Sequence, residues 1–406
     1  MDIGSIMNIM RDPAGIPAAA ALFQVLMVVT WVFHIAFVNL TMGAAGLSIF
    51  AFYKARRGPH WESLSIAMTK VAKVGVSLLI VLGVAPLLFT QVIYDPQWYT
   101  SNLLSASWAI AFIVTLIVGY CLWFAFYWGN HEGARRHIGV YAVIGLALFL
   151  LDGLIMHVLS YQAILPQHWM DWYAPGGVVD TRGAKLHAIQ WPRYNFIMSL
   201  SIPAVGLFLV AYAEYFSPRA DKSPAYLAFA ANLGRRLAYT GFMIGLPFLV
   251  WWHLDHPAQT ELAYAPFAWL MVFAIWLLAR VARDSEGHVS GYALIALGNG
   301  VLLALAVWRE IIRATYLRPF GYVIGDTKVN VDWPSLILFF STFIGIGGLV
   351  GGFYLALLYN AGRVEGRYQA DGTISNLGTG AVAVLALWIA VFFVYGITIW
   401  VRYSFL

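Results

Sequence analysis

The chain has 406 residues, of which 61% are hydrophobic and only 11% charged, and its formal net charge is +5 at pH 7. Soluble domains are about 45–50% apolar and about 25% charged, so this composition excludes an ordinary soluble protein and predicts an integral membrane protein. The basic residues fall in short loops between apolar runs. We therefore expect the lipid bilayer, and no nucleic acid, as a partner of the chain.

Ten apolar stretches are long enough to cross a bilayer, which needs about 20 helical residues. In chain order they cover approximately residues 18–53, 65–92, 104–129, 138–165, 194–216, 237–254, 265–283, 289–313, 335–360 and 380–403. The predicted fold class is an all-α integral membrane protein with about ten transmembrane helices. Since no long soluble segment interrupts the spans, we expect a single polytopic membrane domain over residues 1–406.

Lysine and arginine gather in every second loop, and the other loops are richer in aromatic residues and proline. The basic loops contain Lys54, Arg56, Arg57, Arg135, Arg136, Arg219, Lys222, Arg235, Arg236, Arg280, Arg283, Arg363 and Arg367. The positive-inside rule places these loops in the cytoplasm, so we expect both termini outside a bacterial-type cytoplasmic membrane. The longest loop, about 166–193, either folds over the bundle or meets a partner, and the sequence leaves this open.

The single cysteine, Cys121, lies inside an apolar run. One cysteine excludes an internal disulfide, a Cys-rich zinc site, an iron–sulfur cluster and a covalently attached c-type haem within this chain. The sequence also lacks Walker, HExxH and GxSxG motifs in a suitable context. Any metal must therefore be held by histidine, methionine, a carboxylate or a haem.

Two histidines inside the spans are candidate haem ligands, because ionisable groups within a bilayer are costly and mark functional sites. His34 lies in the motif FHIAFVNLTMG, close to a run of small residues that lets a neighbour approach. Its imidazole is either an axial haem ligand or a hydrogen-bonded interhelical group. His157 lies on an antiparallel span at a similar expected depth, so it is the candidate second ligand.

Two polar clusters lie near the expected outer ends of spans. His253, Asp255 and His256 form either an interfacial cluster, or a group that relays protons or contacts haem propionates. Arg309 and Arg313 flank Glu310, and they either neutralise haem propionates or a quinone headgroup, or pair with Glu310 and nearby carbonyls.

At these positions the chain resembles subunit I of the cytochrome bd quinol oxidases. FHIAFVNLTMG resembles the opening helix of that family, and LGVAPLLFTQVIYDPQW its second helix. DGLIMHVLSYQAILP resembles the fourth helix, AWLMV the seventh, and TYLRPFGYVIGD the loop after the eighth, all in the family's order. The resemblance implies a bd-like bundle with His34 as a ligand of haem b, and Met271 matches the family's methionine ligand.

At several positions this chain lacks the residues that the family uses for its activity, and these differences change the activity that we expect. Ala109 and Ile117 stand where the family carries two glutamates of its oxygen-reducing site, and Asn195 or Phe196 stands near its low-spin haem histidine. The loop that binds quinol in the family is reduced here to HLDHPAQTELAYAP. We therefore expect an electron-transferring or non-catalytic subunit of an oxidoreductase complex, and not an oxygen reductase.

The sequence thus predicts a membrane subunit of a respiratory electron-transfer complex. It would hold haem b near the outer side and link the quinone pool to c-type cytochromes or other redox subunits. The predicted cofactor-binding residues are His34, His157, Met271, Arg309 and Arg313, with His34 and His157 as haem-iron ligands. Two alternatives stay open: a cofactor-free membrane scaffold, and a haem-free quinone-binding subunit that uses Asp152 together with His157.

Overall fold

A computed structural model describes residues 2–134, 136–284 and 288–405. Within these residues ten helical segments are long and apolar enough to cross a membrane, which confirms the predicted fold class. Arg135, one of the predicted cytoplasmic residues, lies outside the described residues. The helices of the ten segments are α2 (Ala20–Lys54), α3 (Pro59–Ile93), α5 (Ala106–Gly129), α6 (Gly139–Gln162), α8 (Trp191–Ser199) with α9 (Ser201–Phe216), α10 (Pro224–Leu254), α11 (Pro266–Asp284), α12 (Gly291–Leu317), α13 (Trp333–Phe340) with α14 (Gly347–Ala361), and α15 (Gly372–Phe405).

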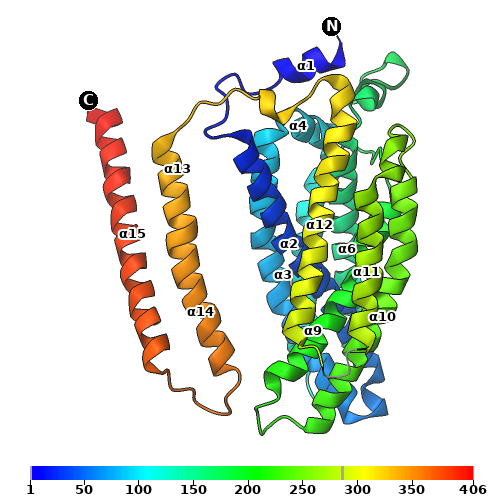
Figure 1. Cartoon of the computed structure of the whole chain (residues 1–406), viewed down its shortest axis with the longest axis vertical. Coiled ribbons are helices and arrows are strands. Elements are labelled where there is room, and N and C mark those ends of the chain that lie inside the picture. Colours follow the sequence, from blue (N-terminus) through cyan, green and yellow to red (C-terminus); the bar gives the residue numbers. More distant parts are fainter. Residues whose placement is uncertain (1, 135, 285–287, 406) are drawn as a thin grey trace.

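Short helices cover one end of the bundle. Helices α1 (Ile3–Ile9) and α4 (Asp95–Leu104) lie there together with both chain termini, and we call this end the α4 side (Figure 1). Helix α7 (Trp169–Tyr173) packs against α4. Short stretches of 3-10 helix lie between the α-helices: Ala55–Arg57, Arg136–Ile138, Pro166–His168, Pro175–Gly177, Thr260–Tyr264, Arg318–Phe320 and Ile324–Asp326.

The helix starts follow local sequence signals. Pro59 and Pro224 occupy the first turns of α3 and α10, where a missing N–H costs nothing. The Ser290 side chain caps α12 by accepting a hydrogen bond from the backbone N–H of Tyr292 at 3.2 Å. Helix α10 begins at Pro224, well before the predicted sixth span at 237, because Arg235 and its neighbour lower the hydropathy without breaking the helix.

Pairs of long helices build the core of the bundle. Helix α2 packs along α3, α9 along α10, and α5 along α6, while α12 packs against both α2 and α9. Large aromatic side chains fill the interior, and Trp123, Trp252 and Trp308 are at most 1% exposed. The helices that enclose the polar site described below are therefore held by an extensive hydrophobic core.

Helices α9 and α10 approach each other closely at a pair of glycines. A Cβ atom placed on Gly206 would lie 2.4 Å from the backbone nitrogen of Ala238 and 2.6 Å from the backbone oxygen of Gly234. Neither neighbour is a flexible side-chain end, so the two backbones would have to separate. Small residues are the usual means by which membrane helices achieve such contact.

We therefore expect Gly206→Ala to lower the free energy of unfolding by about 1–3 kcal/mol, as overpacking does in other cores. Thermal unfolding of the purified protein in detergent provides the measurement. Gly300→Ala is the matched control, because a Cβ on Gly300 of α12 meets no atom within 4 Å. Equal stability of the two variants would show that the α9–α10 contact is looser than described.

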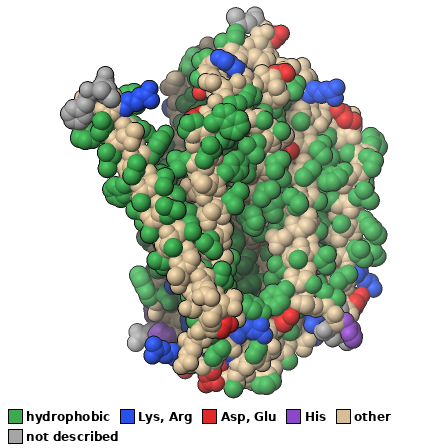
Figure 2. Space-filling view, turned by 60° about the vertical axis from the view of Figure 1, so that its left-hand side comes forward, with side chains coloured by type: hydrophobic (Ala, Val, Ile, Leu, Met, Phe, Trp, Pro, Cys, Tyr) green, Lys and Arg blue, Asp and Glu red, His purple; other side chains and the backbone are tan. Residues whose placement is uncertain are grey.

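The last two spans stand apart from the other eight (Figure 1). In each of these two spans, no residue of the most apolar 18-residue stretch is buried. Contact with the bundle occurs near both ends, where the Phe339 ring meets Phe89 and the Tyr215 hydroxyl donates to the Leu358 carbonyl at 2.9 Å. Figure 2 shows hydrophobic side chains over much of the visible surface, so these helices present apolar faces to their surroundings.

The long loop that follows α6 folds over the bundle. The Trp108 indole N–H donates to the carbonyl of Ala184 at 2.9 Å, and the Ser105 hydroxyl donates to the carbonyl of Lys185 at 2.7 Å. Within the loop, the rings of Trp172 and His187 stack with centroids 5.1 Å apart. Of the two alternatives that the sequence left open, the structure therefore shows the loop packed on its own chain.

Candidate functional site

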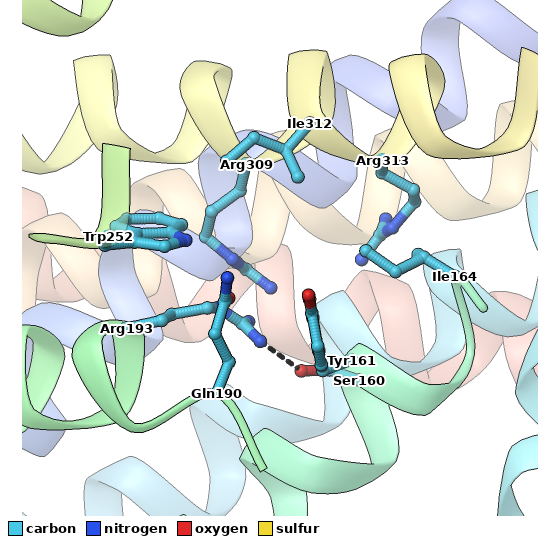
Figure 3. Close-up of a pocket in the computed structure, with 9 residues that line it drawn as sticks. All are labelled: Ser160, Tyr161, Ile164, Gln190, Arg193, Trp252, Arg309, Ile312 and Arg313. Carbon is cyan, nitrogen blue, oxygen red and sulfur yellow. Dashed lines mark hydrogen bonds between the residues drawn. The ribbon is translucent and has the colours of Figure 1, made fainter. Parts of the chain in front are cut away.

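Three arginines converge on one cavity in the part of the bundle near the α4 side. Arg193 comes from the first turn of α8, and Arg309 and Arg313 come from neighbouring turns of α12. Figure 3 shows the three guanidinium groups around the same space. The remaining lining residues are Ser160, Tyr161, Ile164, Gln190, Trp252 and Ile312.

One of the three arginines has an anionic partner. An Nη1 atom of Arg313 lies 2.8 Å from Glu310 Oε1, and the guanidinium lies 4.4 Å from the centre of the Tyr94 ring. The Tyr94 hydroxyl donates to Glu310 Oε2 at 3.1 Å. Burial and the charge of Glu310 raise the pKa of Tyr94 above its ordinary value, which keeps this hydroxyl a donor. Of the two roles predicted for Arg313, the structure shows pairing with Glu310.

Arg309 and Arg193 have only neutral partners among the described residues. The Arg309 guanidinium lies 3.9 Å from the centre of the Trp31 ring, and its Nε atom is buried without a hydrogen-bond partner. Arg193 donates to the Ser160 hydroxyl at 3.0 Å. The cavity is therefore strongly positive, which suits an acidic ligand group.

His34 has the hydrogen bonding expected of a metal ligand. Its Nδ1 atom lies 3.0 Å from the backbone carbonyl of Leu79 on α3, so Nδ1 carries the proton and Nε2 has a free lone pair. The ring packs against Gly83, where a Cβ atom would lie 2.9 Å from His34 Cε1. A glycine at this position is what lets the imidazole lie between α2 and α3.

His157 is 7% exposed, and its Nε2 atom has no hydrogen-bond partner among the described residues. Its ring contacts Tyr194, with centroids 5.6 Å apart. The positive charge of Arg309 acts on both His157 and His34, so both histidines lie within electrostatic reach of this arginine. Ligation of one haem by both histidines stays a prediction.

Met271 lies in the hydrophobic core on α11. The side chain is 3% exposed and belongs to the same cluster as Trp252, Ile275 and Trp308. Packing explains its burial without a metal, and its predicted role as a haem ligand stays a prediction.

Asp152 and His157 share helix α6 but contact different neighbours. The Thr115 hydroxyl of α5 donates to Asp152, whereas His157 contacts Tyr194 of α8. Five residues correspond to roughly 140° around a helix, which turns the two side chains apart. This geometry does not support the quinone-binding pair that the sequence suggested.

His253 and His256 are both buried, at 0% and 1% exposure. His256 Nδ1 lies 3.1 Å from the Tyr316 hydroxyl, and the His253 ring contacts Trp308 edge to face at 5.4 Å. Asp255 lies between the two histidines in the sequence. Its backbone carbonyl accepts a hydrogen bond of 3.0 Å from the side-chain amide of Gln190. The two histidines are thus interior groups, whereas the sequence suggested an interfacial position as one alternative.

Burial lowers the pKa of His256 to about 4, from an ordinary value of 6.5. Because the unfolded chain then binds the proton more readily than the folded chain, stability is complete above about pH 6.5 and falls as the pH drops toward 4. We expect the melting temperature of His256→Gln to fall less than that of the wild type between pH 7 and pH 5. His168→Gln, at a half-exposed side chain, is the control and should retain the full wild-type dependence.

Several residues of the cavity are absent from the sequence-based prediction. Arg193 lies one residue before the predicted start of the fifth span at 194, so it was not counted among the buried charges. Tyr161, which lines the cavity, and Tyr94, which contacts Glu310, carry no distinguishing pattern, because aromatic residues are abundant at the ends of these spans. The one available signal was the position of Arg193 at the start of an apolar run.

Together the fold and the cavity define a polytopic helical membrane protein with a buried basic site near the α4 side. The fold is similar to that of the bd oxidase from Geobacillus thermodenitrificans, with a TM-score of 0.59, 10% sequence identity, and coverage of 84% of this chain and 98% of that chain. This likeness confirms the predicted resemblance at the level of the fold. No protein-family model and no curated protein matches the sequence.

Proposed function

We propose that this chain is a membrane subunit of a respiratory electron-transfer complex, with haem b on His34 near the α4 side. The observation that carries the proposal is the state of His34 within a bd-oxidase fold. Its Nδ1 proton is fixed by the Leu79 carbonyl, and its Nε2 atom is free to bind iron. A bound haem would supply one-electron redox chemistry.

The residues around His34 fit a haem in their chemistry. Arg309 is a partly buried cation within electrostatic reach of His34 and His157, and Arg313 lies one turn further along α12. The cavity between the arginines measures about 20 Å³, whereas a single water needs roughly 10–15 Å³. It therefore has room for a carboxylate but not for a porphyrin, and we propose the arginines as partners of acidic cofactor groups rather than of the ring.

We do not propose oxygen reduction. Ala109 and Ile117 carry no ionisable group, and Ile117 is 58% exposed on the outward face of α5. Asp152 does bring a carboxylate to α5, where it accepts a hydrogen bond from Thr115. A path for protons to a reacting haem would need further ionisable groups along this pair of helices.

We propose that the partners are other membrane subunits and c-type cytochromes. The exposed apolar faces of α13, α14 and α15 suit lipid or another membrane subunit, since none of their most apolar windows is buried. The folded loop after α6 carries exposed hydrophobic side chains, including Met170 at 68% and Val178 at 73%, that suit a redox partner on the α4 side. The quinone pool is the proposed electron donor or acceptor.

We further propose a single polytopic domain in the cytoplasmic membrane, with both termini outside. Both termini lie at the α4 side, and the loops that follow α2 and α9 lie at the opposite end (Figure 1). Those loops carry Arg56, Arg57, Arg219 and Lys222, as the positive-inside rule expects of cytoplasmic loops.

A reduced-minus-oxidised spectrum and a pyridine haemochrome assay of the purified full chain test the haem. The proposal predicts a reduced haem b band and a haemochrome of the b type. A colourless protein would contradict it and would favour the alternative of a cofactor-free scaffold, in which the fold is kept for packing and for docking of partners.

A further inference from the structure

The charges around the arginine cavity do not balance. Both oxygens of the Glu310 carboxylate are engaged, one by Arg313 at 2.8 Å and the other by the Tyr94 hydroxyl at 3.1 Å. Arg193 contacts a hydroxyl, and Arg309 contacts the face of an indole ring. Among the described residues, two guanidinium charges are thus left without an anionic partner.

Uncompensated positive charge inside the helical bundle lowers the stability of the folded protein. Arg193 is 8% exposed, and Arg309 lies within a membrane-spanning helix. Arginine stays protonated under all ordinary conditions, so neither group can lower the cost by losing its proton. Buried charges in membrane proteins are normally paired, and an uncompensated one is strongly destabilising.

Hydrogen-bond donors without partners also indicate that the cavity accommodates an acceptor. The Nε1 atom of Trp252, a residue that is 1% exposed, lines the cavity and has no acceptor, and neither has Arg309 Nε. The cavity also holds one unpartnered acceptor, Oε1 of Gln190, which a bridging water can satisfy. Donors from α8, α10 and α12 therefore face one small space (Figure 3).

We propose that this cavity binds one carboxylate-sized anion between Arg193 and Arg309. Guanidinium groups match carboxylates in charge and geometry, and about 20 Å³ admits a group of that size. The anion is either a free one, such as formate or chloride, or the propionate of a bound haem. The charge imbalance exists without a haem, so binding of a free anion does not depend on the proposed function, whereas the propionate as its source rests on the proposed haem.

Thermal unfolding of the purified full chain tests the free anion. Sodium formate is titrated against sodium gluconate at constant ionic strength, because gluconate is too large for the cavity. Stabilisation by a ligand that binds only the folded state grows with its concentration. Above its dissociation constant, we expect formate to raise the melting temperature roughly with the logarithm of its concentration, by about 2 °C or more over the titration.

The variants Arg193→Gln and Arg309→Gln should lose this dependence on formate. Arg283→Gln is the matched control, because that arginine has a side chain that is 55% exposed on the opposite end of the bundle. If the cavity variants do not fold, bromide replaces formate with the wild-type protein, and its anomalous diffraction signal locates the anion directly.

The haem content of the same samples separates the two sources. A formate response in both wild type and His34→Ala identifies a free anion. A response that is absent from a haem-containing wild type and gained in His34→Ala identifies the propionate, as does a density map with the propionate in the cavity. A formate response that persists in Arg309→Gln, or a map with neither a halide nor a propionate there, overturns the proposal. Absence of haem alone contradicts the proposed function and leaves the anion site standing.

Discussion

His34→Ala should abolish haem binding while the protein still folds. Loss of an outer partner of a metal ligand typically costs 10–100-fold in metal affinity, so loss of the ligand itself should lower the ratio of haem to protein at least about 10-fold. The pyridine haemochrome assay on equal amounts of purified protein gives this ratio. His168→Ala, at a half-exposed side chain on the α4 side, is the matched control and should keep its haem.

A second variant tests the position of the same imidazole without removing it. Gly83→Ala places a methyl group 2.9 Å from His34 Cε1, which forces the ring to shift. We expect a lower haem content or a displaced reduced band, with the folded yield unchanged. A full haem content and an unaltered spectrum in both His34→Ala and Gly83→Ala would place the haem on another ligand, and His157→Ala would then be the next variant to examine.

Glu310→Gln should be the most destabilising single change in the arginine cluster. The variant keeps the size of the side chain but leaves the three guanidinium groups of the cavity with no carboxylate among their described partners. Removal of one partner of a buried ion pair typically costs about 3–5 kcal/mol, and we expect a loss of that size in the free energy of unfolding. Thermal or denaturant unfolding in detergent is the measurement.

Two comparisons make this prediction specific. Asp221→Asn breaks an exposed ion pair with Arg219 and should leave the stability unchanged within error. The double variant Glu310→Gln with Arg313→Gln should be less destabilised than the two single changes added together, because it removes a cation along with its anion. Strict additivity would mean that the two side chains do not interact in solution.

The membrane spans could be predicted from the sequence because hydropathy alone determines them. Ten apolar runs were sufficient to place the ten spanning segments, although not the start of α10. The separation of the last two spans could not be predicted in the same way. Their mean hydropathies are close to those of the first four spans, and only tertiary packing distinguishes them.

The site was predictable in its ionisable residues but not in their contacts. His34, Arg309 and Arg313 stand out because charged or titratable groups are rare in apolar runs. The hydrogen bond between Tyr94 and Glu310 joins residues 216 positions apart, which no local pattern reveals. The divergence of Asp152 and His157 around one helix, by contrast, follows from their spacing and could have been predicted from it.

Reduction of the bound haem by a quinol tests the proposed function most directly. Membranes that contain the wild-type chain with its partner subunits are mixed under anaerobic conditions with a soluble menaquinol analogue, and the reduced b band is followed. We expect the band to form in the wild type and in His168→Ala but not in His34→Ala. A haem b band that the quinol does not reduce, or equal reduction in the His34→Ala membranes, would contradict a chain that carries electrons between the quinone pool and its partners.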